Sequence, residues 1–117
     1  MHKITIWHNP RCSKSREALS ILEENGNEKE IVKYLETNPD ETQIKNLLTM
    51  LGLGARELMR TKEVIYKELN LKEELNEEKL IHAMAENPKL IERPIIIKGS
   101  KAIIGRPTSI VADFLNS

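Results

Sequence analysis

Residues 3–35 read KITIWHNPRCSKSREALSILEENGNEKEIVKYL, and they predict a strand, a helix and a second strand. The first strand covers 3–7, where isoleucines alternate with polar or aromatic residues. The helix covers 13–25 because its apolar residues form one stripe, and Gly26 stands where helices commonly end. The second strand covers 30–35. This opening favours parallel pairing of the two strands through a right-handed crossover.

The middle of the chain, at about 38–88, contains no convincing strand. Its apolar residues recur at helical spacing, as in Ile44, Leu47, Leu48 and Leu51. Helices are expected from Pro39 to Gly52, over 62–69, and through Glu86 from a cap at Asn76, and a shorter helix or turn is expected over 55–59.

The last part of the chain returns to strands. Residues 94–97 and 102–104 flank Lys98-Gly99-Ser100-Lys101, which predicts a tight hairpin. Pro107 suits the first position of a terminal helix. The order strand–helix–strand, helices, strand–strand–helix predicts a thioredoxin-like α/β fold. We therefore expect a single domain over 1–117, with a mixed sheet and a helical insertion at about 38–88.

Composition excludes several classes of protein. The 117 residues are 39% apolar and 31% charged, and 18 basic residues balance 18 acidic ones. General nucleic-acid binding favours a basic excess, which this chain lacks. No apolar run approaches the roughly 20 residues that span a bilayer. One cysteine forms no internal disulfide, and no histidine or carboxylate cluster has metal-ligand spacing. We expect a soluble cytoplasmic protein without a bound metal, acting as a monomer.

The single cysteine, Cys12, lies where the first helix is predicted to begin. Free backbone N–H groups at a helix N-terminus stabilise anions. Arg11, Lys14 and Arg16 lie within four residues, and His8 could add a further positive charge. A buried, inert thiol would have apolar neighbours, whereas these are polar. The sequence therefore predicts a reactive thiol that is largely ionised at neutral pH.

Two families of cysteine chemistry are excluded by spacing. A dithiol oxidoreductase would have its second cysteine where this chain has Ser15, so an external thiol must complete any disulfide chemistry. Protein tyrosine phosphatases carry an arginine six residues after the cysteine, where this chain has Ala18.

Arginines from elsewhere in the fold could bind an oxyanion through their planar, bidentate guanidinium groups. Arg60, Arg93 and Arg106 each lie beside a structural break, and spacing alone does not separate them from Arg11, Arg16 and Arg56. His8 could act as a base, as a charge partner or only as a residue at the end of a loop.

Pro94 stands at the start of the third strand and is either trans at a sheet edge or cis. In thioredoxin-like folds a proline at this position is cis and faces the active cysteine, which would bring Arg93 towards Cys12.

The chain resembles the ArsC-type, glutaredoxin-linked arsenate reductases over essentially its whole length. The resemblance is carried by His8-x3-Cys12-x3-Arg16, Glu57-Leu58-Met59-Arg60, Glu92-Arg93-Pro94-Ile95 and Gly105-Arg106-Pro107. It implies a cysteine nucleophile at Cys12, an influence of His8 on the thiolate, and oxyanion binding by Arg60, Arg93 and Arg106. Ser15, Arg16 and Pro94 would support the cysteine loop.

The resemblance further implies that Cys12 attacks arsenate. Glutathione, a co-substrate rather than a bound cofactor, then reacts with the adduct, and glutaredoxin completes the reduction to arsenite. In the best-studied members, small residues surround the cysteine. In this chain Arg11 and Lys14 lie there instead, and a cysteine loop with these charges resembles that of the YfgD-type branch. Alternatives are a glutathione-dependent monothiol reductase of another oxyanion or mixed disulfide, and an Spx-like regulator that binds RNA polymerase. Spx-like regulators commonly carry Cys-x-x-Cys, which Ser15 interrupts.

Overall fold

Two compact units make up the structure, and each is described by itself. The computed structural model describes residues 3–26 and 28–116. The first unit comprises Met1–Thr37 and Arg93–Ser117, and the second comprises Asn38–Glu92. The expected helical insertion at 38–88 falls within the second unit. The single domain over 1–117 stays a prediction.

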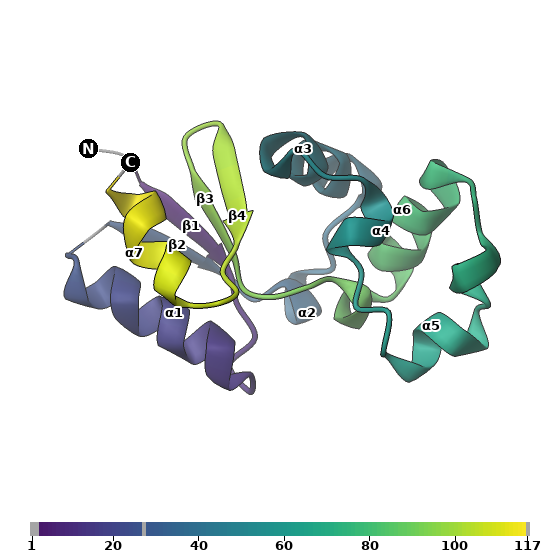
Figure 1. Ribbon diagram of the computed structural model, residues 1–117, viewed down its shortest axis with the longest axis horizontal. Helices are drawn as coiled ribbons and strands as arrows, with labels where there is room; N and C mark the ends of the chain where they lie inside the picture. The colour runs from purple at the N-terminus through teal and green to yellow at the C-terminus, as the bar shows by residue number, and fades with distance from the viewer. Residues whose placement is uncertain (1–2, 27, 117) are drawn as a thin grey trace. The chain divides into compact units, whose positions relative to one another are not determined.

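A mixed sheet of four strands, in the order β2-β1-β3-β4, forms the centre of the first unit (Figure 1). Its strands are β1 (Ile4–Trp7), β2 (Lys29–Val32), β3 (Ile95–Lys98) and β4 (Lys101–Ile104). β1 pairs with β2 in parallel and with β3 antiparallel, and β3 pairs with β4 antiparallel. The parallel opening pair and the late hairpin are both confirmed.

Helices α1 (Ser13–Glu24) and α7 (Ser109–Leu115) pack together and cover one face of this sheet (Figure 1). Because side chains alternate along a strand, Ile4 and Ile6 of β1 share that face. Ile96 lies opposite Ile6 in the antiparallel register and joins them. On this face, these isoleucines form a buried cluster with Ala18, Leu22 and Val111. This cluster anchors the N-terminal half of the first unit to its C-terminal hairpin and helix.

The second strand is shorter than the sequence predicted. β2 ends at Val32, and the short helix α2 (Tyr34–Thr37) follows, so the expected strand over 30–35 is wrong at its end. Amides of residues 36 and 37 bond the Lys33 carbonyl at 2.8 and 3.1 Å. This turn buries the Tyr34 ring, which stacks on Trp7 with centroids 6.1 Å apart. Burial of a large aromatic ring thus decides where the strand stops.

The terminal helix begins later than predicted. Thr108 precedes α7, and Pro107 lies before it, so Pro107 is not the first helical residue. The Pro107 carbonyl accepts from the Ile110 amide at 3.2 Å, which makes this segment a tight turn before the helix. The Arg106–Pro107 and Arg93–Pro94 peptide bonds are both cis. Of the two alternatives for Pro94, trans at a sheet edge or cis, the structure therefore has the cis form.

Among the described residues, the second unit contains helices and one isolated bridge between Met59 and Ile91. Its helices are α3 (Glu41–Leu51), α4 (Ala55–Leu58), α5 (Val64–Glu68), η1 (Leu71–Glu73), α6 (Glu77–Glu86) and η2 (Pro88–Leu90). α6 packs against α3 and α4.

Caps explain where the two longer helices of this unit start. Asp40 accepts from the Gln43 amide at 2.8 Å, so α3 begins at Glu41 rather than at Pro39. Asn76 accepts from the Lys79 amide at 3.2 Å, which confirms the predicted cap of α6. None of the helices in the described ranges is long and apolar enough to cross a membrane.

Candidate active site

The register of the sheet brings three separate segments to one end of the first unit. Trp7 at the end of β1 lies opposite Ile95 at the start of β3, and Ile95 lies opposite Ile104 at the end of β4. The loop after β1, the residues before β3 and the residues after β4 therefore meet at the same edge. These segments carry Cys12, Arg93 and Arg106.

The loop between β1 and α1 turns sharply so that Cys12 caps the helix. The Cys12 amide bonds the Asn9 carbonyl at 3.0 Å, and the Cys12 carbonyl accepts the first helical bond, from Arg16, at 3.0 Å. The Asn9 side chain accepts from the Arg11 amide at 3.0 Å. Cys12 is thus the N-cap of α1, as the sequence predicted. Cys12 is partly exposed, and its side chain lies beside the first amides of α1, which have no partner within the helix.

The environment of Cys12 favours the thiolate. Burial of the sulfur is the largest single influence on its pKa and acts to raise it. The Ser15 amide, the Arg93 side chain and the Lys14 amide act in the opposite direction and together outweigh burial, so the pKa of Cys12 is lowered. A lowered pKa increases the fraction of thiolate, the nucleophilic form, at neutral pH.

Arg93 and Arg106 both reach the cysteine. Arg106 Nη2 lies 3.5 Å from Cys12 Sγ, and Arg106 Nε donates to the Arg93 carbonyl at 2.7 Å. The Gly105 amide donates to the Pro94 carbonyl at 2.8 Å. A Cβ on Gly105 would lie 3.0 Å from Pro94 Cγ and 3.2 Å from Val111 Cγ2, so glycine avoids crowding at this close approach. The two arginines therefore form one cationic cluster at the sulfur.

The sequence predicted that the positive side chains next to Cys12 would stabilise its thiolate. In the structure, those of Arg16 and Lys14 contact other groups. Arg16 Nη1 donates to the Pro10 carbonyl at 3.0 Å and braces the loop. Lys14 lies 3.8 Å from the Glu17 carboxylate. Of the arginines that spacing left open, Arg56 binds Tyr66 and the carbonyls of Leu71 and Glu74. These contacts give Arg56 a structural role within the second unit.

His8 is buried and hydrogen-bonded rather than cationic. Its Nδ1 lies 2.7 Å from Ser15 Oγ, which also accepts from the Asn9 amide at 3.0 Å. Burial lowers the pKa of His8 most, and the positive charges of Lys33 and Arg16 lower it further. His8 is therefore neutral at neutral pH, and the expectation that it could add a positive charge is wrong. Its contact with Ser15 instead joins the start and end of the cysteine loop.

Arg60 belongs to the second unit, where two carboxylates hold it. Its Nε and Nη1 lie 3.0 Å from Glu63 Oε1 and from Glu92 Oε1, respectively. Burial opposes the charge of Arg60, but the two carboxylates outweigh burial and raise its pKa. The spacing of Arg60 and Glu63 could have indicated the first pair. No local signal could have indicated Glu92, which is 32 residues away.

The sequence also missed the contact between His8 and Ser15. A serine in a polar run gives no sign of burial, yet Ser15 is 0% exposed. Its contacts with His8 and Asn9, made from the first turn of α1, follow only once the turn at Asn9 is known. Among the residues that the structure describes, no group of three histidine, cysteine or acidic side chains could hold a metal ion.

The fold and the site define a thioredoxin-like protein with a single activated cysteine. A sequence model of the ArsC family matches residues 7–114. The chain is 56% identical over 115 residues to the Escherichia coli K12 protein called Uncharacterized protein YfgD, with 97% of each chain covered. It is 51% identical over 109 residues to a Neisseria meningitidis serogroup B protein named Arsenate reductase, covering 92% of this chain and 93% of that one.

A solved structure shows the same fold. The structure described as Arsenate reductase from Vibrio cholerae matches with a TM-score of 0.92 and 48% identity, over 96% of this chain and 97% of that one. The predicted thioredoxin-like class is confirmed by this match. The protein belongs to the ArsC family.

Proposed function

We propose that this protein is an arsenate reductase in which Cys12 is the nucleophile and glutathione and glutaredoxin supply the electrons. The observation that carries the proposal is the approach of Arg93 and Arg106 to a cysteine whose pKa is lowered. The names of the relatives in Neisseria and Vibrio support arsenate as the oxyanion.

In the first step, the Cys12 thiolate attacks arsenic. A sulfur–arsenic bond forms, one arsenate oxygen leaves as water after protonation, and arsenic stays pentavalent. The guanidinium groups of Arg93 and Arg106 neutralise the anion and orient it for attack. The same groups stabilise the charge that develops on the oxygens during the displacement.

Electrons for the reduction come from outside the chain, because Cys12 is its only cysteine. A glutathione thiol adds to arsenic with loss of a second water. A glutaredoxin thiol then takes the glutathione sulfur as a mixed disulfide, and arsenic gains the two electrons that the two sulfurs lose. Water finally cleaves the remaining sulfur–arsenic bond, which returns Cys12 and releases arsenite.

Arg60 is the third proposed oxyanion-binding arginine. Because Glu63 and Glu92 already contact its guanidinium, substrate would have to displace or share one of these carboxylates. The two carboxylates therefore weaken the contribution of Arg60 to the binding of an anion.

The test is NADPH consumption that depends on arsenate, in a system coupled through glutathione reductase, glutathione and glutaredoxin. The wild-type protein should turn over, and Cys12→Ser should reduce the rate by at least about 10³-fold. Circular dichroism and urea unfolding of Cys12→Ser control for loss of structure. A wild-type rate no higher than that of Cys12→Ser, with an active glutaredoxin present, contradicts the proposal.

A further inference from the structure

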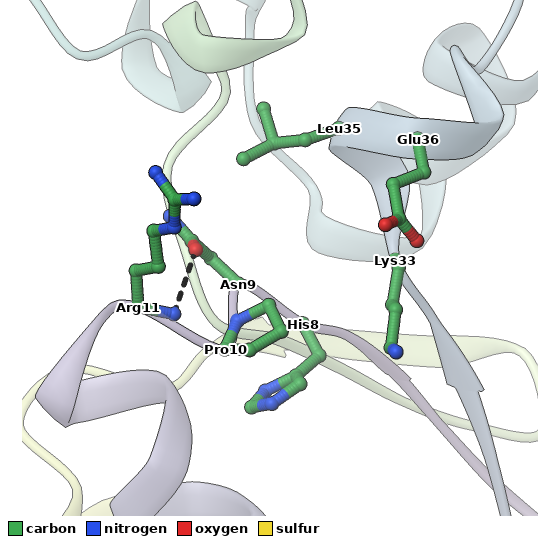
Figure 2. A pocket seen from close by; sticks show the side chains of 7 residues that line it. All are labelled: His8, Asn9, Pro10, Arg11, Lys33, Leu35 and Glu36. Carbon is green, nitrogen blue, oxygen red and sulfur yellow. Dashed lines mark hydrogen bonds between the residues drawn. The ribbon is translucent and has the colours of Figure 1, made fainter.

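A cavity beside the cysteine loop has no role in the proposed binding of the oxyanion. It has a volume of about 280 Å³ and is lined by His8, Asn9, Pro10, Arg11, Lys33, Leu35 and Glu36. This volume is close to the lower end of the roughly 300–1,000 Å³ of typical small-molecule sites. Figure 2 shows that the lining comes from the loop before Cys12 and from the segment after β2.

The topology of the sheet separates this cavity from the arginines at the sulfur. In the strand order β2-β1-β3-β4, the cysteine loop follows β1, with β2 on one side and β3 on the other. Val32 at the end of β2 pairs in parallel with Trp7, so Lys33 emerges at the same edge as the loop. Arg93 and Arg106 emerge on the β3–β4 side. The lining of the cavity includes none of Cys12, Arg93 and Arg106, so an oxyanion held between those arginines and Cys12 would not fill it.

The charges around the cavity are mixed. Arg11 and Lys33 are exposed cations, and Glu36 is an exposed carboxylate in α2 (Figure 2). Among the ion pairs of the described ranges, 3–26 and 28–116, none includes these three side chains. Two cations and one anion complement a small molecule with carboxylates and an ammonium group. An amino-acid-like arm of a thiol peptide has these groups.

We propose that this cavity binds the charged backbone groups of the small anionic thiol that reacts with Cys12 or its adduct. Arg11 and Lys33 face its carboxylates, and Glu36 faces its ammonium group. The inference rests on the proposed function, since a chain with one cysteine needs a second thiol from solution. The thiol and the oxyanion then reach the same sulfur from opposite sides of the loop.

The test uses thiol–disulfide exchange without any oxyanion. The Cys12 thiolate attacks one sulfur of a disulfide, the disulfide bond breaks, and a mixed disulfide with Cys12 forms while the other sulfur leaves as a thiolate. The probes are oxidised glutathione and the uncharged bis(2-hydroxyethyl) disulfide, and mass spectrometry follows the mixed disulfide. The measured quantity is the rate constant for oxidised glutathione divided by that for bis(2-hydroxyethyl) disulfide. A change in the reactivity of Cys12 itself affects both rate constants and therefore cancels in this ratio.

Lys33→Gln and Arg11→Gln should each lower this ratio, in favour of the uncharged probe, by about two- to fivefold, which is the range for exposed charge pairs. Lys14→Gln is the matched control, because Lys14 is also a cation close to Cys12 but lies outside the cavity. Its ratio should change by less than the ratios of the two cavity variants. Unchanged ratios in Lys33→Gln and Arg11→Gln, or an equal fall in Lys14→Gln, would overturn the proposal.

Glu36→Gln adds a test in which the reaction rate should change in opposite directions for two different disulfide probes. It should slow the reaction of oxidised glutathione, which carries ammonium groups, and accelerate that of dithiodiglycolate, which carries only carboxylates. Acceleration of both would overturn the proposed contact with the ammonium group. If arsenate is turned over but the substitutions in the cavity leave the ratios unchanged, only the proposed role of the cavity is contradicted. If those substitutions change the ratios but arsenate is not turned over, only the proposed function is contradicted.

Discussion

The arginines of the two units differ in the charges that they meet. In the first unit, Arg93 and Arg106 contact the sulfur of Cys12, and Arg93 helps to lower the pKa of its thiol. In the second unit, Arg60 lies 3.0 Å from each of two carboxylates, those of Glu63 and Glu92. An arginine that already has carboxylate partners has less attraction left for an anionic substrate. Sequence motifs alone do not distinguish the three arginines. Their contacts in the structure do distinguish them.

The largest effect is expected from the arginines at the sulfur. Arg106→Gln and Arg93→Gln should each lower kcat/KM for arsenate by about 10²–10³-fold, the range for loss of one preorganised donor to a developing oxyanion. Steady-state kinetics in the coupled assay measures this loss. Lys101→Gln, which removes an exposed charge from the same hairpin, should change kcat/KM by less than twofold, about 0.4 kcal/mol. If kcat/KM fell by a similar factor in all three variants, the two arginines would act only through the overall positive charge and not through direct contact with the oxyanion.

Ser15→Ala tests how the first unit holds the cysteine loop. Loss of the hydroxyl leaves the His8 ring and the Asn9 amide without this buried partner, so the free energy of unfolding should fall by about 1–3 kcal/mol. Urea unfolding measures the difference. Ser13→Ala is the matched control, because Ser13 is exposed at the start of the same helix, and its effect should stay within about 0.5 kcal/mol. Equal effects of the two substitutions would show that the buried contact contributes nothing.

Glu63→Gln tests the second side of the comparison. Removal of one carboxylate makes the surroundings of Arg60 more positive, so the KM for arsenate should fall by about two- to fivefold, with little change in kcat. Glu68→Gln, an exposed carboxylate at the end of α5, should leave KM within twofold, about 0.4 kcal/mol. A higher KM in Glu63→Gln would mean that the carboxylate positions Arg60 for substrate instead of competing with it.

The smallest effect concerns pH. The pKa of His8 is lowered on folding, so the unfolded chain binds a proton there more readily than the folded protein does. The stability contributed by neutral His8 is complete above its unfolded pKa of about 6.5 and is lost as pH falls towards its lower folded value. Urea unfolding at pH 7.5 and pH 5.5, both about one unit from that pKa, should show a smaller loss in His8→Gln than in the wild type. An equal loss in both proteins would assign the acid sensitivity to other groups.

Much of the fold follows from local signals. The strand–helix opening, the hairpin around Gly99 and the helix ends at Gly26 and Gly52 are set by periodicity and by residues that adopt a left-handed backbone. The end of β2 was missed because Lys33-Tyr34-Leu35 continues a strand pattern. Tertiary burial of the Tyr34 ring against Trp7 overrides that pattern.

The candidate site was only partly predictable. The part of the lowered pKa of Cys12 that comes from the Ser15 and Lys14 amides follows from its place at a helix N-terminus, which the sequence reveals, whereas the part that comes from Arg93 depends on the fold. The approach of Arg106 depends on the register of Trp7, Ile95 and Ile104, which no spacing along the chain encodes. Motif resemblance selected Arg93 and Arg106 where spacing could not. It gave no sign of the carboxylates around Arg60, since Glu92 approaches it only through the fold of the second unit.

Titration of the Cys12 thiol, followed by ultraviolet absorbance of the thiolate, tests most directly whether the first unit activates its cysteine. The wild-type pKa should lie below the ordinary cysteine value of about 8.5. Arg93→Gln should raise the pKa of Cys12, because Arg93 stabilises the thiolate, and Lys101→Gln should leave it unchanged. A wild-type pKa at the ordinary value, or an Arg93→Gln pKa equal to that of the wild type, would contradict this account.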